Sequence, residues 1–231
     1  MLVFGHVTMR RVKRRARSVS AALLCGVAVP LIYFGCQVIA ARFYRGYSFL
    51  TQSASELGSP ASDLPQILNF GAMATGVCLI VAGFGFAAAL PQAGSSRIVA
   101  WLTCLAMLSA GASGVWASHF PLPDPRHNPR LLGAGAYALP ILLLLAFWPV
   151  CRAMRKYLLV NAILFAALIP LMAGLTAIDT RPFGGLLQRV AAAVVYVPVG
   201  VAALRLSRRA ARTWPRRQRS RSGRRDGAAS P

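Results

Sequence analysis

The sequence predicts an all-α integral membrane protein, a bundle of six transmembrane helices with both termini in the cytoplasm. The 231 residues are 56% hydrophobic and only 13% charged, whereas soluble domains carry about 25% charged residues. The apolar residues gather into blocks of about 20 residues, which is typical of membrane spans. These blocks are continuous and lack two-residue alternation, which favours helices over the strands of a barrel.

Six apolar runs give the predicted spans, which cover residues 19–41, 67–90, 98–118, 131–150, 157–177 and 186–206. Each run is long enough to cross a hydrocarbon core of about 30 Å. The first run exceeds the roughly 7–15 residues of a signal-peptide core, and further spans follow it, so we interpret it as a span. Arg189 lies one turn inside the last run, where its side chain is expected to reach back to the membrane surface.

Two basic segments flank the predicted transmembrane domain of residues 18–206. Residues 1–17 form a basic N-terminal segment, and residues 207–231 form a basic tail that lacks apolar periodicity and is predicted to be disordered. The formal net charge of +21 is compatible with nucleic acid or anionic lipid as a partner. Because both segments are tethered to the bilayer, we expect contact with anionic lipid headgroups and no nucleic acid.

The distribution of charge predicts the orientation of the chain in the membrane. Of the 26 lysines and arginines, those predicted to face outward are Arg42, Arg45, Arg126, Arg130, Arg181 and Arg189. All the others fall on the side of the two termini, which the positive-inside rule places in the cytoplasm. Four of the five acidic residues lie on the outer side: Glu56, Asp63, Asp124 and Asp179. The strong preference for arginine over lysine suggests a bacterial protein, so we expect a multi-pass protein of the bacterial cytoplasmic (inner) membrane.

The first outer loop, residues 42–66, is the longest polar interruption in the chain. Residues 52–57 are predicted to form a helical turn, on which Ser53 and Glu56 share a face because they are three residues apart. Ser62 and Asp63 precede a proline and are predicted to cap the second span. Asn69 lies one turn into that span, where its amide needs a hydrogen-bond partner.

The second and third outer loops hold the remaining polar candidates. Prolines in residues 119–130 favour an extended polyproline II segment, which places Asp124 and His127 on one side and His119 on another. Asp179 and Arg181 in the third loop are predicted to form a local ion pair or a turn.

Several chemistries remain open for these loops. Carboxylates and imidazoles suit a divalent metal such as zinc, and the candidate ligands are Glu56, His119, Asp124, His127 and Asp179. Alternatively, Glu56 and Asp124 pair with arginines of their own face, namely Arg42, Arg45, Arg126 or Arg130, and the histidines are interfacial. A third possibility is Ser53 or Ser55 as a nucleophile activated by His127. The sequence contains no G-x-S-x-G, H-E-x-x-H, P-loop or G-x-G-x-x-G motif.

The order of the outer-loop motifs resembles that of a known family. The matching features are Ser53-x-Ser55-Glu56-Leu57, then Asn69-Phe70-Gly71, then Phe120-Pro121-x-x-Asp124 with His127 downstream. On these motifs the chain resembles the six-span membrane family called "domain of unknown function 998", over residues 18–206. The resemblance implies the fold and the topology but no reaction. It also implies a role beyond folding for Ser53, Ser55, Glu56, Asn69, Asp124 and His127, which are the candidate ligand-binding residues.

Three classes of function follow from the sequence. The first is a membrane protein with an outward-facing polar site for a small ligand or a lipid headgroup. The second is a membrane-embedded hydrolase at the periplasmic face, with or without a metal, whose catalytic candidates are Glu56, Asp124 and His127. The third is a non-catalytic membrane assembly component.

Overall fold

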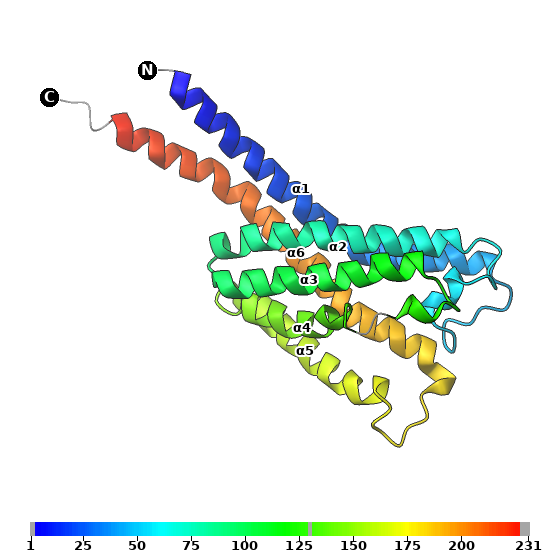
Figure 1. Cartoon of the computed structure of the whole chain (residues 1–231). Helices are drawn as coiled ribbons and strands as arrows, with labels where there is room; N and C mark the ends of the chain where they lie inside the picture. Colours follow the sequence, from blue (N-terminus) through cyan, green and yellow to red (C-terminus); the bar gives the residue numbers. More distant parts are fainter. Residues whose placement is uncertain (1–2, 129–130, 227–231) are drawn as a thin grey trace.

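The part of the chain that the structure describes forms a bundle of six α-helices (Figure 1). The computed structural model describes residues 3–128 and 131–226, with side chains described for residues 16–128 and 131–210. The helices are α1 (Val3–Ala40), α2 (Gln66–Ala93), α3 (Arg97–His119), α4 (Ala134–Phe147), α5 (Arg152–Met172) and α6 (Gly184–Asp226). Short 3-10 helices lie in the connections: η1 (Ala41–Phe43), η2 (Ala54–Gly58), η3 (Pro125–His127) and η4 (Arg181–Phe183). The described residues contain no β-strand.

Five of the helices are long and apolar enough to cross a membrane. These segments are Ala16–Phe43, Gln66–Ala93, Arg97–His119, Arg152–Met172 and Arg181–Ala210. Helix α4 is apolar but has only 14 residues, so the predicted span of residues 131–150 is longer than the helix found there. Turns at residues 131–133 and 148–150 shorten it at both ends. The chain is therefore a helical, multi-pass membrane protein.

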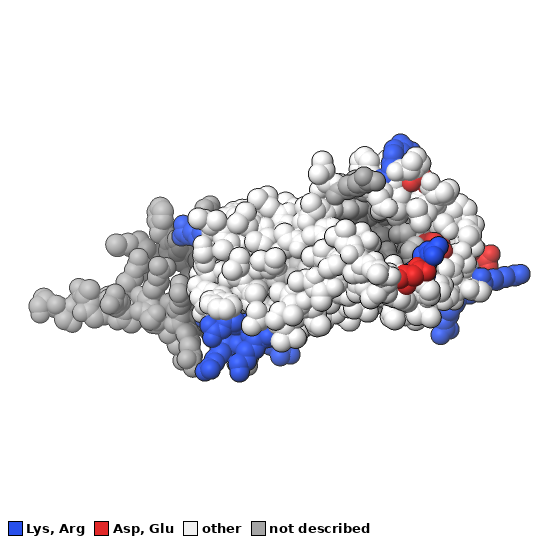
Figure 2. All heavy atoms as spheres, turned by 90° about the horizontal axis from the view of Figure 1, so that it is seen from below, with Lys and Arg blue, Asp and Glu red and all other residues white. Residues whose placement is uncertain are grey.

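Charged side chains gather at the two ends of the bundle, and the apolar surface lies between them (Figure 2). Among the described side chains in this view, the acidic groups appear at one end and a large cluster of basic groups at the other. Large apolar side chains are exposed along the helices, including Leu31, Phe84, Trp101 and Ile163, each more than half accessible. This pattern suits helices whose outer faces contact lipid.

Helices α2 and α3 pack closely through small residues. A Cβ atom on Gly76 would lie 2.5 Å from the carbonyl oxygen of Gly111, and one on Gly111 would lie 2.5 Å from the carbonyl oxygen of Gly76. Ala106 and Ala110 are buried on the same helix as Gly111. Small residues therefore bring these two helices into close contact.

Helix α1 packs against α6 along a second close contact. A Cβ on Gly26 would lie 2.8 Å from the Cβ of Ala203, and one on Gly200 would lie 2.9 Å from Pro30. Fully buried side chains, among them Leu23 and Phe86, fill the space between α1 and α2 and join the main core cluster. This core holds α1, α2 and α6 together.

Both terminal helices project from the same end of the bundle (Figure 1). Helix α6 continues to Asp226, whereas the sequence predicts disorder from residue 207. Alanine and arginine are strong helix formers, and the tail continues directly from a stable span, so it keeps the helical path. The predicted tail residues 227–231 and the first two residues of the N-terminal segment lie outside the described part of the chain.

Candidate functional site

The first outer loop is fastened to the start of α6 by Arg189. Its Nη1 donates to the carbonyl oxygens of Phe49 at 3.1 Å, Gln52 at 2.9 Å and Gly185 at 2.8 Å. Its Nη2 donates to the hydroxyl of Tyr47, and the guanidinium lies 4.8 Å from the ring centre of Phe49. Arg189, whose side chain is expected from the sequence to reach back to the membrane surface, thus holds the first outer loop on α6.

Backbone contacts complete this attachment. The Leu186 N–H donates to the Leu50 carbonyl at 2.9 Å, and the Gln188 Oε1 accepts from the Ala54 N–H at 2.7 Å. Gly185 packs against the backbone of Gln52, so closely that a Cβ there would collide with the Gln52 carbonyl. These contacts fix the position of η2 and hence of Ser55.

Glu56 lies at the centre of a hydrogen-bond network within the first loop. Its Oε1 accepts from the Ser53 N–H at 2.8 Å and the Ser53 hydroxyl at 3.0 Å, and its Oε2 accepts from the Gln52 amide at 3.0 Å. Partial burial alone raises the pKa of Glu56, but the hydrogen bonds from Ser53 and Gln52, together with the charge of Arg189, lower it below its ordinary value. Glu56 is therefore held as a carboxylate.

Ser55 and His127 meet across two loops that are far apart in the sequence. The Ser55 Oγ and the His127 Nε2 are 2.9 Å apart, and the His127 Nδ1 is 2.8 Å from the Phe120 carbonyl oxygen. Because a carbonyl oxygen only accepts, Nδ1 carries a proton, and in the neutral ring Nε2 accepts from the Ser55 hydroxyl. Only 9% of the surface of His127 is accessible. The pair has the geometry of a hydroxyl next to an oriented base.

The second outer loop folds back toward the first, which brings His127 to Ser55. The predicted extended segment is wrong, because residues 125–127 form η3, with Asp124 as its N-cap. The Asp124 carboxylate contacts the Arg126 guanidinium at 2.8 Å, as the arginine-pairing alternative predicts. Hydrogen bonds from Arg126 lower the pKa of Asp124 to about 2. Asp124 thus faces Arg126 while His127 turns inward, so the two do not share one side.

The remaining candidates take local structural roles. Asp179 pairs with Arg181 at 3.0 Å, as predicted, and the exposed His119 contacts the Val115 carbonyl of its own helix at 2.9 Å. The Asn69 amide donates to the Gly58 carbonyl at 3.1 Å, which ties α2 to η2.

The predicted cap of α2 by Ser62 and Asp63 is wrong. The N-cap is Pro65, without a side-chain hydrogen bond. Instead, the Ser62 hydroxyl and the Asp63 N–H both donate to the Phe43 carbonyl. The chain places Pro65 itself at the start of the helix, where its fixed φ is favourable, and the two residues before it close the first loop onto η1.

The described side chains include no group of three or more His, Cys, Asp or Glu residues that is suited to a metal ion. Of the predicted zinc ligands, Glu56, Asp124 and Asp179 have their carboxylates bonded to neighbours in their own loops. Arg130, one alternative partner for the carboxylates, lies outside the described residues. The zinc hypothesis therefore stays a prediction without support from this geometry.

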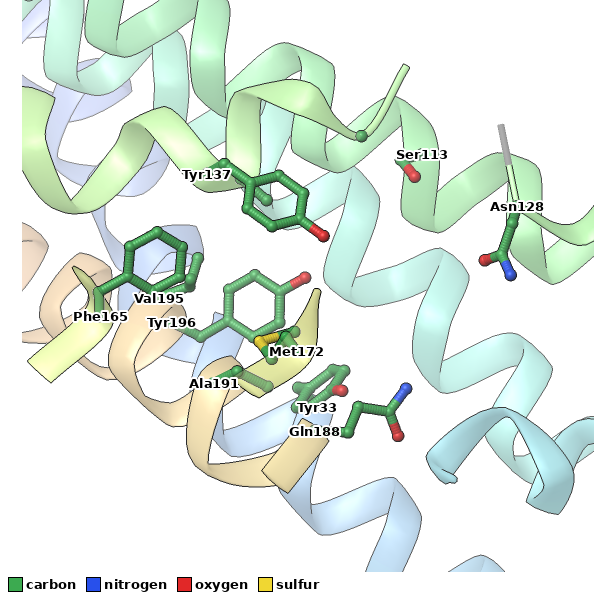
Figure 3. Close-up of a pocket in the computed structure, with 13 residues that line it drawn as sticks. Tyr33, Ser113, Asn128, Tyr137, Phe165, Met172, Gln188, Ala191, Val195 and Tyr196 are labelled. Carbon is green, nitrogen blue, oxygen red and sulfur yellow. The ribbon is translucent and has the colours of Figure 1, made fainter. Parts of the chain in front are cut away.

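A pocket of about 560 Å³ adjoins the Ser55–His127 pair, between α1, α3, α4, α5 and α6 (Figure 3). Ser55 and His127 do not line the pocket themselves, but two lining residues contact their chain neighbours or adjoin them: Asn128 follows His127, and Gln188 bonds the backbone of Ala54, which precedes Ser55. Its wall combines apolar side chains with three tyrosines, Tyr33, Tyr137 and Tyr196. The hydroxyls of Tyr137 and Tyr196 point in the same direction into the space between the helices (Figure 3).

The tyrosine hydroxyls are open to a ligand. Within the described part of the chain, no hydrogen bond involves the hydroxyl of Tyr33, Tyr137 or Tyr196. Hydroxyls at the depth of a membrane cost free energy unless they are hydrogen-bonded. The pocket therefore offers donors and acceptors at one part of its wall and apolar contacts at the rest.

Sequence reasoning missed the pocket and part of the site around it. Arg189 gave a signal, because it is a cation one turn inside a span, but its partners are carbonyl oxygens 137 and 140 residues away. Gln188 and the three tyrosines gave no signal in the sequence, since isolated polar residues near the ends of apolar helices are common.

Comparison with known proteins agrees with the resemblance drawn from the outer-loop motifs. The family described as "Protein of unknown function (DUF998)" matches residues 26–205. No curated protein and no solved structure matches the chain significantly.

Proposed function

We propose that this chain, which belongs to the DUF998 family, binds an amphipathic lipid in the pocket beneath its outer loops. The observation that carries the proposal is the composition of the pocket wall. Tyr137, Tyr196 and Gln188 supply polar groups, while Phe165 and Val195 supply apolar surface. A molecule with a polar head and a hydrocarbon chain satisfies both parts, whereas a small, fully polar ligand leaves the apolar part uncovered.

The surrounding structure supports a stable rather than a transient pocket. Arg189 and Gln188 hold the first loop on α6, and the Phe120 carbonyl holds His127. A binding site whose polar groups are already fixed loses less entropy when the ligand enters. We therefore expect the wild-type protein to retain lipid after purification in mild detergent.

Photo-crosslinking tests this function directly. The probe is a phospholipid with a diazirine in its acyl chain, reconstituted with the full-length protein. Crosslinks are expected on peptides of α4, α5 and α6 that line the pocket. Ala192→Trp places a large ring in the pocket and is expected to reduce these crosslinks at least fivefold. Val197→Trp is the control, because Val197 lies on the same helix, is 38% exposed and does not line the pocket. This control is expected to leave the crosslinks unchanged.

Crosslinking that does not depend on the pocket contradicts the proposal. If Ala192→Trp folds normally by size-exclusion chromatography and still crosslinks as the wild type does, the lipid is bound elsewhere. Crosslinks spread equally over all the outer helix faces likewise indicate ordinary bilayer contact and no specific site.

A second candidate function is acyl-ester hydrolysis at the same site, and the Ser55–His127 hydrogen bond favours it. The Ser55 Oγ attacks an ester carbonyl carbon as its proton passes to the His127 Nε2. The bond to the leaving alcohol breaks, and that alcohol takes the proton from Nε2. Water, deprotonated by the same nitrogen, then attacks the acyl-serine and releases the acid with Ser55 regenerated.

A fluorophosphonate probe separates this candidate from binding alone. Phosphonylation of Ser55 is expected in the wild type and lost in Ser55→Ala. Ser53→Ala removes the other predicted nucleophile and one of the three hydrogen bonds to Glu56, and it is expected to keep most of the labelling. His127→Gln is expected to slow labelling by about 10²-fold or more, the usual contribution of a general base. If the wild type is not labelled, or Ser55→Ala is labelled equally, hydrolysis is excluded and lipid binding remains.

A further inference from the structure

At the opposite end of the bundle from the outer loops, a second pocket of about 540 Å³ lies between the start of α5 and the middle of α6. Its apolar wall comes from both helices, and its rim carries arginines. The lining residues are Val150, Cys151, Met154, Val201, Leu204, Arg205, Arg208 and Arg209. The described residues that line it include no aspartate or glutamate.

Cys151 fixes one side of this pocket. The Arg205 Nη2 lies 2.7 Å from the Cys151 Sγ, and Cys151 is the N-cap of α5. Backbone N–H groups of Met154 and Ala153, followed by the charge of Arg205, lower the pKa of the thiol despite its partial burial. The local potential is therefore positive enough to favour an anion.

More cations surround the pocket on the same face. Arg152, Arg155 and Lys156 occupy the first turns of α5, and Figure 2 shows the blue cluster at this end of the bundle. The apolar wall distinguishes the pocket from a plain basic surface, because Val201, Leu204 and Met154 offer contacts to hydrocarbon. Basic pockets between membrane helices are suited to phospholipid headgroups.

We propose that this inner pocket binds an anionic phospholipid, with its phosphate on Arg205 and Arg208 and its acyl chain along Val201, Leu204 and Met154. A nucleic acid has no hydrocarbon chain to pack against the apolar wall. A zwitterionic lipid carries no net negative charge, so its attraction to the arginines is weaker. The site is separate from the outer pocket, so the proposal holds or fails independently of the function proposed above.

Native mass spectrometry of the full-length protein, released from detergent, tests the proposal. The probes are phosphatidylglycerol and phosphatidylcholine at equal concentration, and phosphatidylglycerol is expected to give the stronger bound peak. Arg205→Gln with Arg208→Gln is expected to weaken phosphatidylglycerol binding about 30-fold, as expected for two lipid-facing cations. The matched control is Arg17→Gln with Arg97→Gln, which removes two cations of the same face that do not line the pocket, and binding is expected to change less than threefold.

Cys151 provides a second readout in the folded protein. In a variant whose only cysteine is Cys151, a bound phosphate competes with the thiol for Arg205, so phosphatidylglycerol is expected to slow maleimide labelling severalfold. Gln92→Cys, placed in the same background without Cys151, reports the general effect of the anionic surface and is expected to change little. An excess of inorganic phosphate is expected to leave both rates unchanged, since it lacks the acyl chain.

Three results overturn the proposal. Equal weakening by the two double variants means that only the overall charge of the face matters. Equal slowing at Cys151 and at the cysteine introduced at position 92 means that the lipid does not occupy the pocket. Slowing at Cys151 by inorganic phosphate alone means that the pocket is an anion site and not a lipid site.

Discussion

Glu56 illustrates how a single carboxylate organises the first outer loop. It accepts three hydrogen bonds from Ser53 and Gln52, and the nearby Arg189 acts through its charge and without a direct ion pair. Hydrogen bonds to an ionised acceptor are worth more than those between neutral groups. Ser55 lies within this turn, between Ser53 and Glu56, so its approach to His127 depends on the same network.

Glu56→Gln is expected to destabilise the folded protein by about 1–2 kcal/mol at neutral pH, because one amide oxygen replaces two carboxylate acceptors. Thermal unfolding in detergent, followed by tryptophan fluorescence, measures the change. Asp63→Asn on the same loop is the control, since its side chain is exposed, and it is expected to leave the unfolding temperature unchanged. Equal melting temperatures for Glu56→Gln and the wild type contradict the assigned role.

The acid dependence of stability follows from the same group. The pKa of Glu56 is lowered in the folded state, as are the pKa values of Asp124 and Asp179. Each contributes stability above its ordinary pKa, which is 4.5 for Glu56, and loses it as pH falls through the folded value. The unfolding temperature is expected to decrease from pH 4.5 downward, with a smaller slope in Glu56→Gln. An unfolding temperature that does not change with pH in this range contradicts the lowered pKa values.

The residues also show which contacts a sequence can predict. The Ser53–Glu56 contact follows from a spacing of three residues. The pairs of Asp124 with Arg126 and of Asp179 with Arg181 are two residues apart and are equally local. The Ser55–His127 contact joins residues 72 apart and depends on how η3 folds back onto η2. No local pattern carries that information, and the extended conformation expected from the prolines points away from it.

At the scale of elements, composition predicts the helices better than their ends. The close contact of Gly76 on α2 with Gly111 on α3 is evident only from the structure. Helix α4 is shorter than its apolar run because turns at both ends interrupt the helical hydrogen bonding. Helix ends depend on capping and on neighbouring loops, as Pro65 at the start of α2 shows.

Gly76→Ala is expected to destabilise the bundle by about 1–3 kcal/mol, because the added methyl group meets backbone atoms of α3 that cannot move easily. Gly35→Ala on α1 is the matched control, since a Cβ there meets nothing within 4 Å. It is expected to be neutral or to stabilise the helix by up to about 1 kcal/mol. Fluorescence-detected chromatography after heating measures both variants, and equal losses contradict the close-contact argument.

For the whole molecule, the separation of charge along the bundle supports the predicted orientation. The outer loops carry Glu56, Asp124 and Asp179, while Arg97, Arg152 and Arg205 lie at the other end with the projecting ends of α1 and α6. Lysines and arginines are retained on the cytoplasmic side during insertion. In the predicted orientation, the pocket beneath the first loop faces outward and the arginine-rimmed pocket faces inward.

Reporter fusions test this orientation. A fluorescent protein fused after residue 231 is expected to fluoresce in the cytoplasm, whereas alkaline phosphatase inserted after Gly46 is expected to be active outside it. Both results follow from the excess of cations at the ends of α1 and α6. Active phosphatase at the C-terminus, with an inactive insertion at Gly46, reverses the assignment of both pockets.

Helix α4 has a mechanical consequence for the surrounding bilayer. Its 14 residues rise about 21 Å, less than the hydrocarbon thickness of about 30 Å. The bilayer beside it is expected to become thinner to match this length, which brings headgroups nearer to Tyr137, a residue of α4 that lines the pocket. The protein is thus expected to deform the membrane at the place where a lipid enters it, and thicker bilayers are expected to hinder that entry.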